Sequence, residues 1–383
     1  MRKFLPTIAL IIFFTAFLFS TAIAANPDSP WKFSHEQLRP FWQSTIMYGE
    51  SLLFLADKGA SPKALLLFQP TRIVSVCDSS GKITYEPGHD YIWKPGTKEI
   101  VLPKGSRIIS KTSADLRSAH GTQKYDLHHR DGGPAILFAP KHEYHVMQTM
   151  VTYEHKPDAW KGPRPSFAGT QLPRTIKKLS EKRPLKIALL GDSISTGCNS
   201  SGWANVPPFQ PPYQDLLVMN LEAAYGSKVE LVNFAVGGMS TPWGVENIGR
   251  VIEAKPDLVI LAFGMNDASG RSASDYQAKT RAMVDAVRKA LPETEVILVA
   301  TMLGNKDWIA LKQELFPQYS NALAELCGPG VALADMTSVW TELLKHKKDW
   351  DMTGNGVNHP NDFGHRVYAQ VLSALLINDT SVK

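Results

Sequence analysis

The 383-residue sequence is poor in cysteine and contains no Cys-x-x-Cys pair. Its three cysteines are Cys77, Cys198 and Cys327. Three thiols allow at most one disulfide, so the fold does not depend on a disulfide framework. The missing Cys-x-x-Cys spacing also argues against a zinc ribbon or a thiol redox site. We expect the three cysteines to be buried free thiols.

The chain also has no large excess of positive or negative charge. Lys and Arg number 41 against 36 Asp and Glu, a formal net charge of +5 with no dense basic cluster. This balance gives no support for nucleic-acid binding. A hydrophobic share of 44% with 20% charged residues is typical of globular proteins and not of disordered chains. Because the length exceeds one ordinary core of about 100–200 residues, we expect two domains.

One apolar run stands out, at the N-terminus. Arg2 and Lys3 precede the run 4–19, and Ala22-Ile23-Ala24 follows with small residues at a spacing that signal peptidase accepts. The pattern predicts a secretory signal peptide over residues 1–25, and so a secreted or periplasmic protein. A membrane anchor is the alternative, but the run is shorter than the ~20 apolar residues that span a bilayer. We therefore expect no stable membrane insertion after cleavage.

Residues 26–165 are rich in short β-type segments separated by Gly, Pro or Asp. Such a pattern favours a β-sandwich of jelly-roll type. A proline-rich stretch follows, and we place a linker at residues 166–184, where proline disfavours helix. The expected strands of the sandwich are 64–68, 72–76, 83–85, 100–102, 107–110 and 135–138.

Residues 185–383 alternate between strand and helix patterns. This alternation predicts a three-layer α/β/α domain, flavodoxin-like, with a parallel sheet whose functional residues follow the carboxyl ends of the strands. The expected strands are 185–190, 229–235, 258–263, 296–301 and 331–334. The expected helices are 214–225, 245–254, 273–290, 310–326 with a break near Pro317, and 363–376.

Four short segments at the ends of these elements carry chemically useful residues. They are Gly191-Asp192-Ser193-Ile194-Ser195, Asn233-Phe234-Ala235-Val236-Gly237-Gly238, Gly264-Met265-Asn266-Asp267 and Asn358-His359-Pro360-Asn361-Asp362. Each alone is a common turn sequence. Together and in this order, they resemble the four blocks of the SGNH/GDSL hydrolase superfamily. The resemblance covers about residues 185–377 and leaves residues 26–165 without an assignment.

The resemblance implies a role for each block. Ser193 would be the nucleophile and His359 the general base that takes its proton. The oxyanion hole would consist of the Ser193 and Gly238 backbone N–H groups and the Asn266 side-chain amide. Gly238 has no Cβ, so a substrate oxygen can approach its amide closely, although Gly237 is adjacent. Asn266 supplies a donor that does not titrate.

The acid of the triad is where the sequence departs from the family. The family places Asp three residues before the histidine, and this chain has Gly356 there. Asp351 could reach His359 from a longer loop. Asn355 or a backbone carbonyl could orient the ring, which would leave a Ser–His dyad. Asp362 could also serve, although its position suits a helix cap. We favour Asp351 as the orienting acid.

Other aromatic and histidine residues are weaker candidates. Trp243 follows the second block, and its ring could stack on a sugar, although core packing accounts for most tryptophans. The N-terminal histidines match no standard zinc spacing, so we predict no metal site; they are His120, His128, His129, His142 and His145.

The resemblance thus predicts an exported serine esterase that removes acyl groups, most simply acetyl, from carbohydrate. The cycle would pass through an acyl-enzyme on Ser193 without a cofactor. A β-sandwich followed by this hydrolase resembles acetyl-polysaccharide esterases, some of which use a Ser–His dyad. The alternatives are a lipase, lysophospholipase or thioesterase of the same superfamily, a polysaccharide O-acetyltransferase, and a non-catalytic carbohydrate-binding protein. The expected partner is a small-molecule or polysaccharide ester.

Overall fold

The computed structural model describes residues 30–57 and 59–378. The predicted signal peptide lies outside this range. Among the helices that the model describes, none combines the length and the apolarity needed to cross a membrane. Cys77, Cys198 and Cys327 are all free, and each is half-buried rather than fully buried.

The C-terminal part is built on a five-stranded parallel sheet with strand order β12-β11-β13-β14-β15. The three central strands are almost entirely apolar and buried, as strands covered on both faces must be. The predicted α/β domain with a parallel sheet is confirmed. Its strands are β11 (Leu185–Gly191), β12 (Val229–Asn233), β13 (Leu258–Ala262), β14 (Glu295–Ala300) and β15 (Val331–Asp335).

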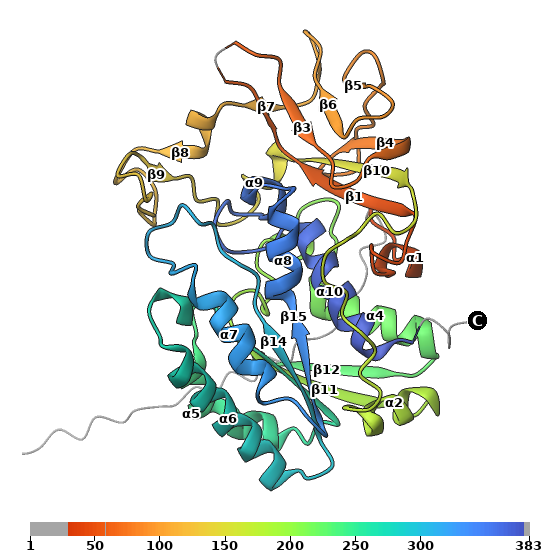
Figure 1. The fold of residues 1–383 in the computed structure, drawn as a ribbon, viewed down its shortest axis with the longest axis vertical. Helices are drawn as coiled ribbons and strands as arrows, with labels where there is room; N and C mark the ends of the chain where they lie inside the picture. Colours follow the sequence, from red (N-terminus) through yellow and green to blue (C-terminus); the bar gives the residue numbers. More distant parts are fainter. Residues whose placement is uncertain (1–29, 58, 379–383) are drawn as a thin grey trace, which may run out of the picture.

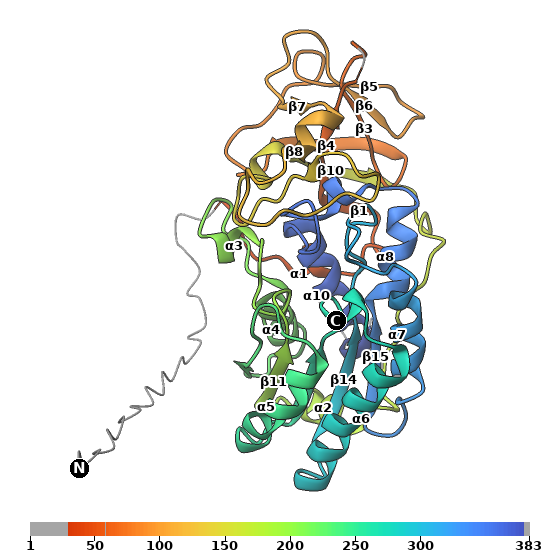
Figure 2. The same ribbon diagram turned by 90° about the vertical axis from the view of Figure 1, so that its left-hand side faces the viewer.

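Helices cover both faces of this sheet (Figures 1 and 2). The chain steps from β11 outward to β12 and then back across β11 to β13, so right-handed crossovers put the two connecting helices on opposite faces. Accordingly α4 (Tyr213–Tyr225) packs with α10 (Asp362–Leu376). On the other face α5 (Thr241–Glu253), α6 (Ala273–Ala290) and α7 (Leu315–Ala324) pack in sequence. The strand order therefore reverses beside β11, which is where ligands bind in open sheets of this kind.

Three of the predicted helices, α4, α6 and α10, match the observed bounds to within one residue. Helix α5 begins four residues earlier than predicted, at Thr241, and α7 differs more. The sequence pattern over 310–326 suggested a helix with a break at Pro317, whereas α7 begins at Leu315. Pro317 thus lies in the first turn of the helix, where the missing N–H of proline breaks no intrahelical hydrogen bond. The remaining C-terminal helices are α8 (Met336–Leu344) and α9 (Asp349–Met352), with the short α3 (Ser201–Ala204) and η3 (Asp267–Ser269) near the ends of strands.

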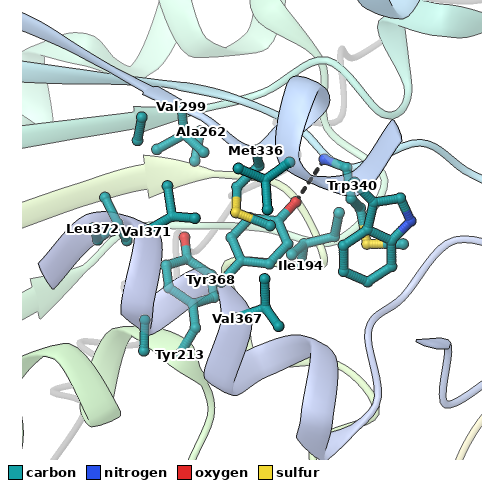
Figure 3. Packing of buried hydrophobic residues seen from close by; sticks show 14 of the residues in the cluster. Ile194, Tyr213, Ala262, Val299, Met336, Trp340, Val367, Tyr368, Val371 and Leu372 are labelled. Atoms are coloured by element: carbon teal, nitrogen blue, oxygen red, sulfur yellow. Dashed lines mark hydrogen bonds between the residues drawn. The ribbon is translucent and has the colours of Figure 1, made fainter. Parts of the chain in front are cut away.

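Tyr368 anchors α10 to the sheet. Figure 3 shows its ring between α10 and the sheet, close to Met336 and Trp340. Its hydroxyl oxygen accepts a 2.8 Å hydrogen bond from the backbone N–H of Met302, just beyond β14. Burial of the ring and satisfaction of its hydroxyl both fix the position of α10. They therefore also fix the loop that precedes α10, which carries His359.

The N-terminal part is sheet-rich. One antiparallel sheet has the order β1-β10-β4, and a second has the order β5-β6-β3-β2-β7. The bounds are β1 (Ile46–Leu52), β2 (Phe54–Leu55), β3 (Lys63–Leu65), β4 (Pro70–Asp78), β5 (Ile92–Trp93), β6 (Glu99–Val101), β7 (Ser110–Lys111) and β10 (Thr149–His155), with a separate pair β8 (Arg117–Ser118) and β9 (Ala135–Ile136). Short helical turns are α1 (His35–Leu38), η1 (Ser113–Leu116) and η2 (His145–Met147).

Several sequence predictions for this part differ from the structure. Of the strand predicted at 107–110, only Ser110 lies in a strand, β7. The central strand β10 and its neighbour β1 were not predicted, although the burial of β10 alternates residue by residue. Residues 83–85 form an isolated bridge, Cys77 to Thr84, rather than a strand. Helix α2 (Pro173–Ser180) lies inside the predicted linker. It begins with proline at its first position, where a proline is tolerated because that N–H has no intrahelical partner.

The two parts share one continuous buried cluster of apolar side chains. At their junction the Lys347 ammonium donates to the Glu50 carboxylate over 2.6 Å, and both side chains are fully buried. The Tyr153 hydroxyl donates to the second Glu50 oxygen over 2.5 Å. The Arg366 guanidinium donates to the backbone carbonyls of Tyr48 and Gly49. The N-terminal sheets are thus fixed against the end of α10 that faces the His359 loop (Figure 1).

Candidate active site

Ser193 lies in a tight turn directly after β11. The Asp192 side chain accepts a hydrogen bond from the Ile194 N–H, and its backbone carbonyl accepts from Ser195 and Thr196. The Ser193 carbonyl in turn accepts from the Cys198 N–H. Asp192 thus organises the turn, and the Ser193 side chain points toward the site with a residue exposure of 7%.

The Ser193 hydroxyl meets the His359 ring. Ser193 Oγ lies 2.8 Å from His359 Nε2, although the two residues are 166 positions apart in the sequence. His359 lies in the loop before α10, and Asn355 shapes that loop. The Asn355 Oδ1 accepts hydrogen bonds from the backbone N–H groups of Val357, Asn358 and His359. Asn355 therefore acts on the backbone of the loop and not on the ring.

The other ring nitrogen is held by Asn199. His359 Nδ1 lies 2.7 Å from Asn199 Oδ1. The Asn199 Nδ2 group faces three backbone carbonyls, at 3.3 Å from Ala139, 2.8 Å from Lys141 and 3.2 Å from Gly354. Only the NH₂ end of an amide can donate to carbonyls, so these contacts fix which end of the side chain is the oxygen. Nδ1 must then carry the proton, which leaves the Nε2 lone pair facing the Ser193 hydroxyl.

Asn199 was missed in the sequence analysis. Its backbone is left-handed, with φ of +65°, a conformation that asparagine tolerates better than most residues. It lies six residues after Ser193 in the sequence, but nothing in the local pattern marks it as a partner of a histidine 160 residues away. Two of the three carbonyls that orient it belong to the N-terminal part, so its setting depends on tertiary contacts.

The prediction that Asp351 orients His359 is wrong in its geometry. The Asp351 carboxylate accepts hydrogen bonds from the backbone N–H groups of Leu53 and Lys348 and lies 3.9 Å from the Lys347 ammonium. Both His359 ring nitrogens have other partners. Asp351 instead ties α9 to Leu53, the residue between β1 and β2, because a buried carboxylate needs hydrogen-bond donors.

Asp362 also lies away from the ring. Its carboxylate accepts from the Ser201 N–H over 2.7 Å, and the helix cap predicted for it is provided by Asn361, whose side chain accepts from the Gly364 N–H. The family position for the acid, Gly356, has φ of +78°. A Cβ there would lie 2.8 Å from the Tyr144 ring and 2.9 Å from the Leu137 carbonyl. The N-terminal part thus occupies the space that an acidic side chain would need.

Two backbone N–H groups at the site are available as donors. Within residues 30–57 and 59–378, neither the Ser193 N–H nor the Gly238 N–H has a hydrogen-bond partner. Gly238 has φ of +80°, and an added Cβ would meet nothing within 4 Å, so the space beside its Cα is open. The adjacent Gly237 is closer to the nucleophile, since its added Cβ would lie 3.7 Å from the Ser193 Cβ.

Asn266 follows β13 at the same edge of the sheet. Its Nδ2 donates to the Met239 carbonyl over 2.8 Å, and this leaves one further N–H of the amide for another acceptor. The neighbouring Asp267 is buried and accepts from the Thr241 N–H and hydroxyl. The two residues therefore tie the turn after β13 to the loop that carries Gly238.

Burial changes the titration of two groups at the site. It lowers the pKa of His359 to about 4, because the charged ring is poorly solvated there. It raises the pKa of Asp192 to about 7, and the nearby Asp267 carboxylate adds to that rise. His359 is therefore neutral at pH 7, the state in which Nε2 can accept a proton.

Trp243 is half-buried near the start of α5. Its ring makes an edge contact with Phe263, with ring centroids 6.4 Å apart. This contact accounts for its position through packing, and the sugar-stacking role stays a prediction. His365 lies inside α10 and is buried, with its Nε2 donating to the Cys198 carbonyl over 3.1 Å, so it supports the turn after Ser193.

Comparison with known proteins matches residues 189–367 to the GDSL-like Lipase/Acylhydrolase family. A search of curated protein sequences returned no match. Similar solved structures include a two-domain esterase active on acetylated mannans, co-crystallised with mannopentaose. The two chains are 20% identical, the match covers 55% of this chain and 54% of that chain, and the TM-score is 0.44. This chain therefore spans about half the length of that esterase.

Two further similar structures each cover about half of this chain. A mutant acetyl-xylooligosaccharide esterase from Geobacillus stearmophilus has 21% identity over 49% of this chain and 92% of its own, with a TM-score of 0.40. A lipase from a goat rumen metagenome has 19% identity over 50% of this chain and 96% of its own, with a TM-score of 0.41.

Proposed function

Residues 189–367 form a domain of the GDSL-like lipase/acylhydrolase family, and from this premise we propose that the chain hydrolyses carboxylic esters with Ser193 as its nucleophile. The observation that carries the proposal is the 2.8 Å contact between Ser193 Oγ and His359 Nε2. A serine beside a neutral imidazole whose other nitrogen is oriented by a third group is the arrangement that acyl transfer needs.

The first half of the cycle forms an acyl-enzyme. Ser193 Oγ attacks the ester carbonyl carbon while its proton moves to His359 Nε2. The carbonyl oxygen becomes an oxyanion, which accepts hydrogen bonds from the unpartnered N–H groups of Ser193 and Gly238 and from the free amide N–H of Asn266. The bond to the alkoxy oxygen then breaks, and His359 returns its proton to that oxygen. The alcohol leaves, and the acyl group stays on Ser193.

The second half repeats these steps with water. His359 Nε2 takes a proton from a water molecule as its oxygen attacks the acyl carbon. The oxyanion forms in the same hole, the bond to Ser193 Oγ breaks, and the serine recovers its proton from the ring. A carboxylic acid is released. In both halves Asn199 Oδ1 holds the Nδ1 proton of His359, which keeps Nε2 directed at the reacting atoms.

Asn199 differs from a carboxylate in one respect that affects the rate. Its amide oxygen fixes the tautomer and ring orientation, but it carries no negative charge to stabilise the imidazolium that forms in each step. The low pKa of His359 also disfavours the imidazolium, because a weaker base binds the serine proton less tightly. The site is thus a Ser–His dyad positioned by an amide.

We propose short acyl esters of carbohydrate, acetyl esters above all, as the substrates. Residues 236–238, which carry the Gly238 donor, are exposed, so an ester on a bulky molecule can reach the donors. This feature supports a substrate that presents its acyl group at the surface of a larger polar body. The proposal of export, from the N-terminal sequence pattern, agrees with a substrate outside the cytoplasm.

A panel of p-nitrophenyl esters, from acetate to long-chain acyl groups, tests the reaction and the acyl preference together. We expect Ser193→Ala to abolish hydrolysis of every ester and the wild type to prefer acetate. Release of acetate from acetylated polysaccharides, measured with and without acceptor sugars, then tests the substrate class. A preference for long acyl chains would identify a lipase, and transfer of acetyl to an added sugar would identify an acetyltransferase.

A further inference from the structure

Away from the serine site, a loop of the N-terminal part brings two histidines and an aspartate together. The ligand-type atoms of His120, Asp126 and His128 all lie within 4.8 Å of one another. His120 Nδ1 is 3.0 Å and 3.1 Å from the two Asp126 carboxylate oxygens, and His128 Nε2 is 3.7 Å from Asp126 Oδ2. The two imidazole rings lie with centroids 4.9 Å apart.

The His120 ring lies between two hydrogen-bond acceptors. Its Nε2 faces the Gly133 carbonyl at 3.2 Å, and its Nδ1 faces the Asp126 carboxylate. Both neighbours are acceptors, but a neutral imidazole has a single N–H. If Nε2–H donates to the Gly133 carbonyl, the Nδ1 lone pair points at a carboxylate. Either a second ring proton or a cation bound to Nδ1 and to the carboxylate resolves that conflict. With the cation bound, the Gly133 carbonyl orients the ring as backbone carbonyls do for metal-bound histidine.

The spacing suits a small divalent ion. Zn²⁺ binds histidine nitrogen and carboxylate oxygen at about 2.0–2.2 Å, which puts neighbouring ligand atoms of a tetrahedral site about 3.3 Å apart. Asp126 Oδ2 lies 3.1 Å from His120 Nδ1 and 3.7 Å from His128 Nε2, and these separations bracket that value. Two imidazoles and one carboxylate also form a donor set of the borderline kind that Zn²⁺ and its first-row neighbours prefer. The three side chains are partly exposed, so an ion could enter and water could complete its coordination.

The loop that carries these residues is also the one that docks on the α/β part. The His128 carbonyl accepts from the Ile309 N–H over 3.1 Å, and the Arg130 N–H donates to the Asp307 carbonyl over 2.8 Å. The Arg130 guanidinium donates to the Leu311 carbonyl over 3.0 Å. An ion that crosslinks His120 to His128 would close the loop immediately beside these contacts. It would therefore hold the docking segment in the conformation that fits residues 305–311.

The spacing of these residues in the sequence predicted no metal site, but the fold brings them together, and we propose that His120, Asp126 and His128 form a divalent metal site of the Zn²⁺ class that clamps this loop against the α/β part. The ion has a structural role here. The site lies outside the Ser193–His359 pair, so its occupancy is measured separately from ester hydrolysis, and the proposal stands or falls independently of the proposed activity.

Isothermal titration of ZnCl₂ into the full chain, purified without a polyhistidine tag and stripped with EDTA, tests the site. We expect one ion per chain and a rise in the unfolding temperature on binding. His120→Ala and His128→Ala each should weaken binding about tenfold or more, and the double variant should lose both the binding and the temperature rise. Co²⁺ titration should give visible d–d absorption in the wild type and not in the double variant.

His346→Ala is the matched control. His346 is an exposed histidine 3.7 Å from the Glu342 carboxylate, and among the described residues it belongs to no group of three ligand-type side chains. Binding by this variant should equal that of the wild type. Circular dichroism of each metal-free variant checks that the fold is kept. No saturable Zn²⁺ binding by the wild type, or unchanged binding by the double variant, would overturn the proposal and leave these residues as a surface ion pair.

Discussion

His359 Nδ1 and Asn199 Oδ1 lie 2.7 Å apart, so an amide occupies the position at which a serine hydrolase commonly has a carboxylate. The amide is itself oriented by three backbone carbonyls, two of them from the N-terminal part. The orientation of the proposed general base therefore depends on contacts between the two parts of the chain.

Replacing Asn199 should slow turnover without removing the nucleophile. Asn199→Ala deletes the acceptor for the Nδ1 proton, so the ring loses both its fixed tautomer and its orientation. We expect kcat to fall roughly tenfold to a hundredfold, as for a barrier increase of about 1.4–3 kcal/mol, with KM little changed. Steady-state kinetics on p-nitrophenyl acetate measure this. A fall in activity explained entirely by a higher KM would contradict a positioning role.

The loss of kcat/KM at acid pH, the acid limb of the pH profile, should occur at an unusually low pH. A base acts in its neutral form, and burial lowers the pKa of His359 to about 4, so kcat/KM should persist well below the ordinary histidine value of about 6.5 and fall near pH 4. Asn199→Asp places a negative charge beside the ring and should raise that pKa, which moves the limb to higher pH. Profiles of kcat/KM against pH for the wild type and Asn199→Asp show whether the pKa of His359 rises or falls in the variant.

The control for this profile is Asp192, because burial raises its pKa to about 7 and it titrates in the same experiment. Asp192→Asn keeps an oxygen to accept the Ile194 N–H but removes the titration. The acid limb near pH 4 should survive in this variant. If it moves with Asp192→Asn and not with Asn199→Asp, the titrating group is Asp192 and the assignment of the limb to His359 is wrong.

Asp351 should matter for stability and not for turnover. Its carboxylate accepts from the Leu53 and Lys348 N–H groups, and Asp351→Ala leaves these donors without a partner in a buried setting. We expect a loss of about 1–3 kcal/mol in the free energy of unfolding, measured by denaturant titration. The kcat of the folded variant should stay within a few-fold of the wild type. A loss of kcat like that of Asn199→Ala would restore Asp351 to the catalytic arrangement.

Gly356 should tolerate no side chain. Gly356→Ala would meet the Tyr144 ring and the Leu137 carbonyl at under 3 Å and would also strain a backbone with φ of +78°. We expect destabilisation of about 2–4 kcal/mol from overpacking and strain together. Gly226→Ala is the control, since Gly226 has φ of +64° but open space around it. Gly226→Ala should lose less free energy of unfolding, because only its backbone is strained. Equal losses of stability in the two variants would contradict the steric explanation.

Much of the α/β part could be predicted from the sequence because its signals are local. The strands β11, β13 and β14 are apolar runs with clear ends, and α6 has the bounds that helical periodicity predicts. The N-terminal part was harder. Its strands are short, and β1 carries a glycine and a buried glutamate whose charge is compensated by Lys347, nearly 300 residues away. A local sequence pattern cannot predict a partner so distant in the chain.

The sequence by itself determined that Ser193, Gly238, Asn266 and His359 would gather at one edge, because each follows a strand or precedes a helix of a parallel sheet whose carboxyl ends meet there. Tertiary structure alone decided what orients the base. Backbone carbonyls at Ala139 and Lys141 select the orientation of Asn199, and Tyr144 fills the space beside Gly356. Every residue has a carbonyl, and only the folded chain determines which amide it faces.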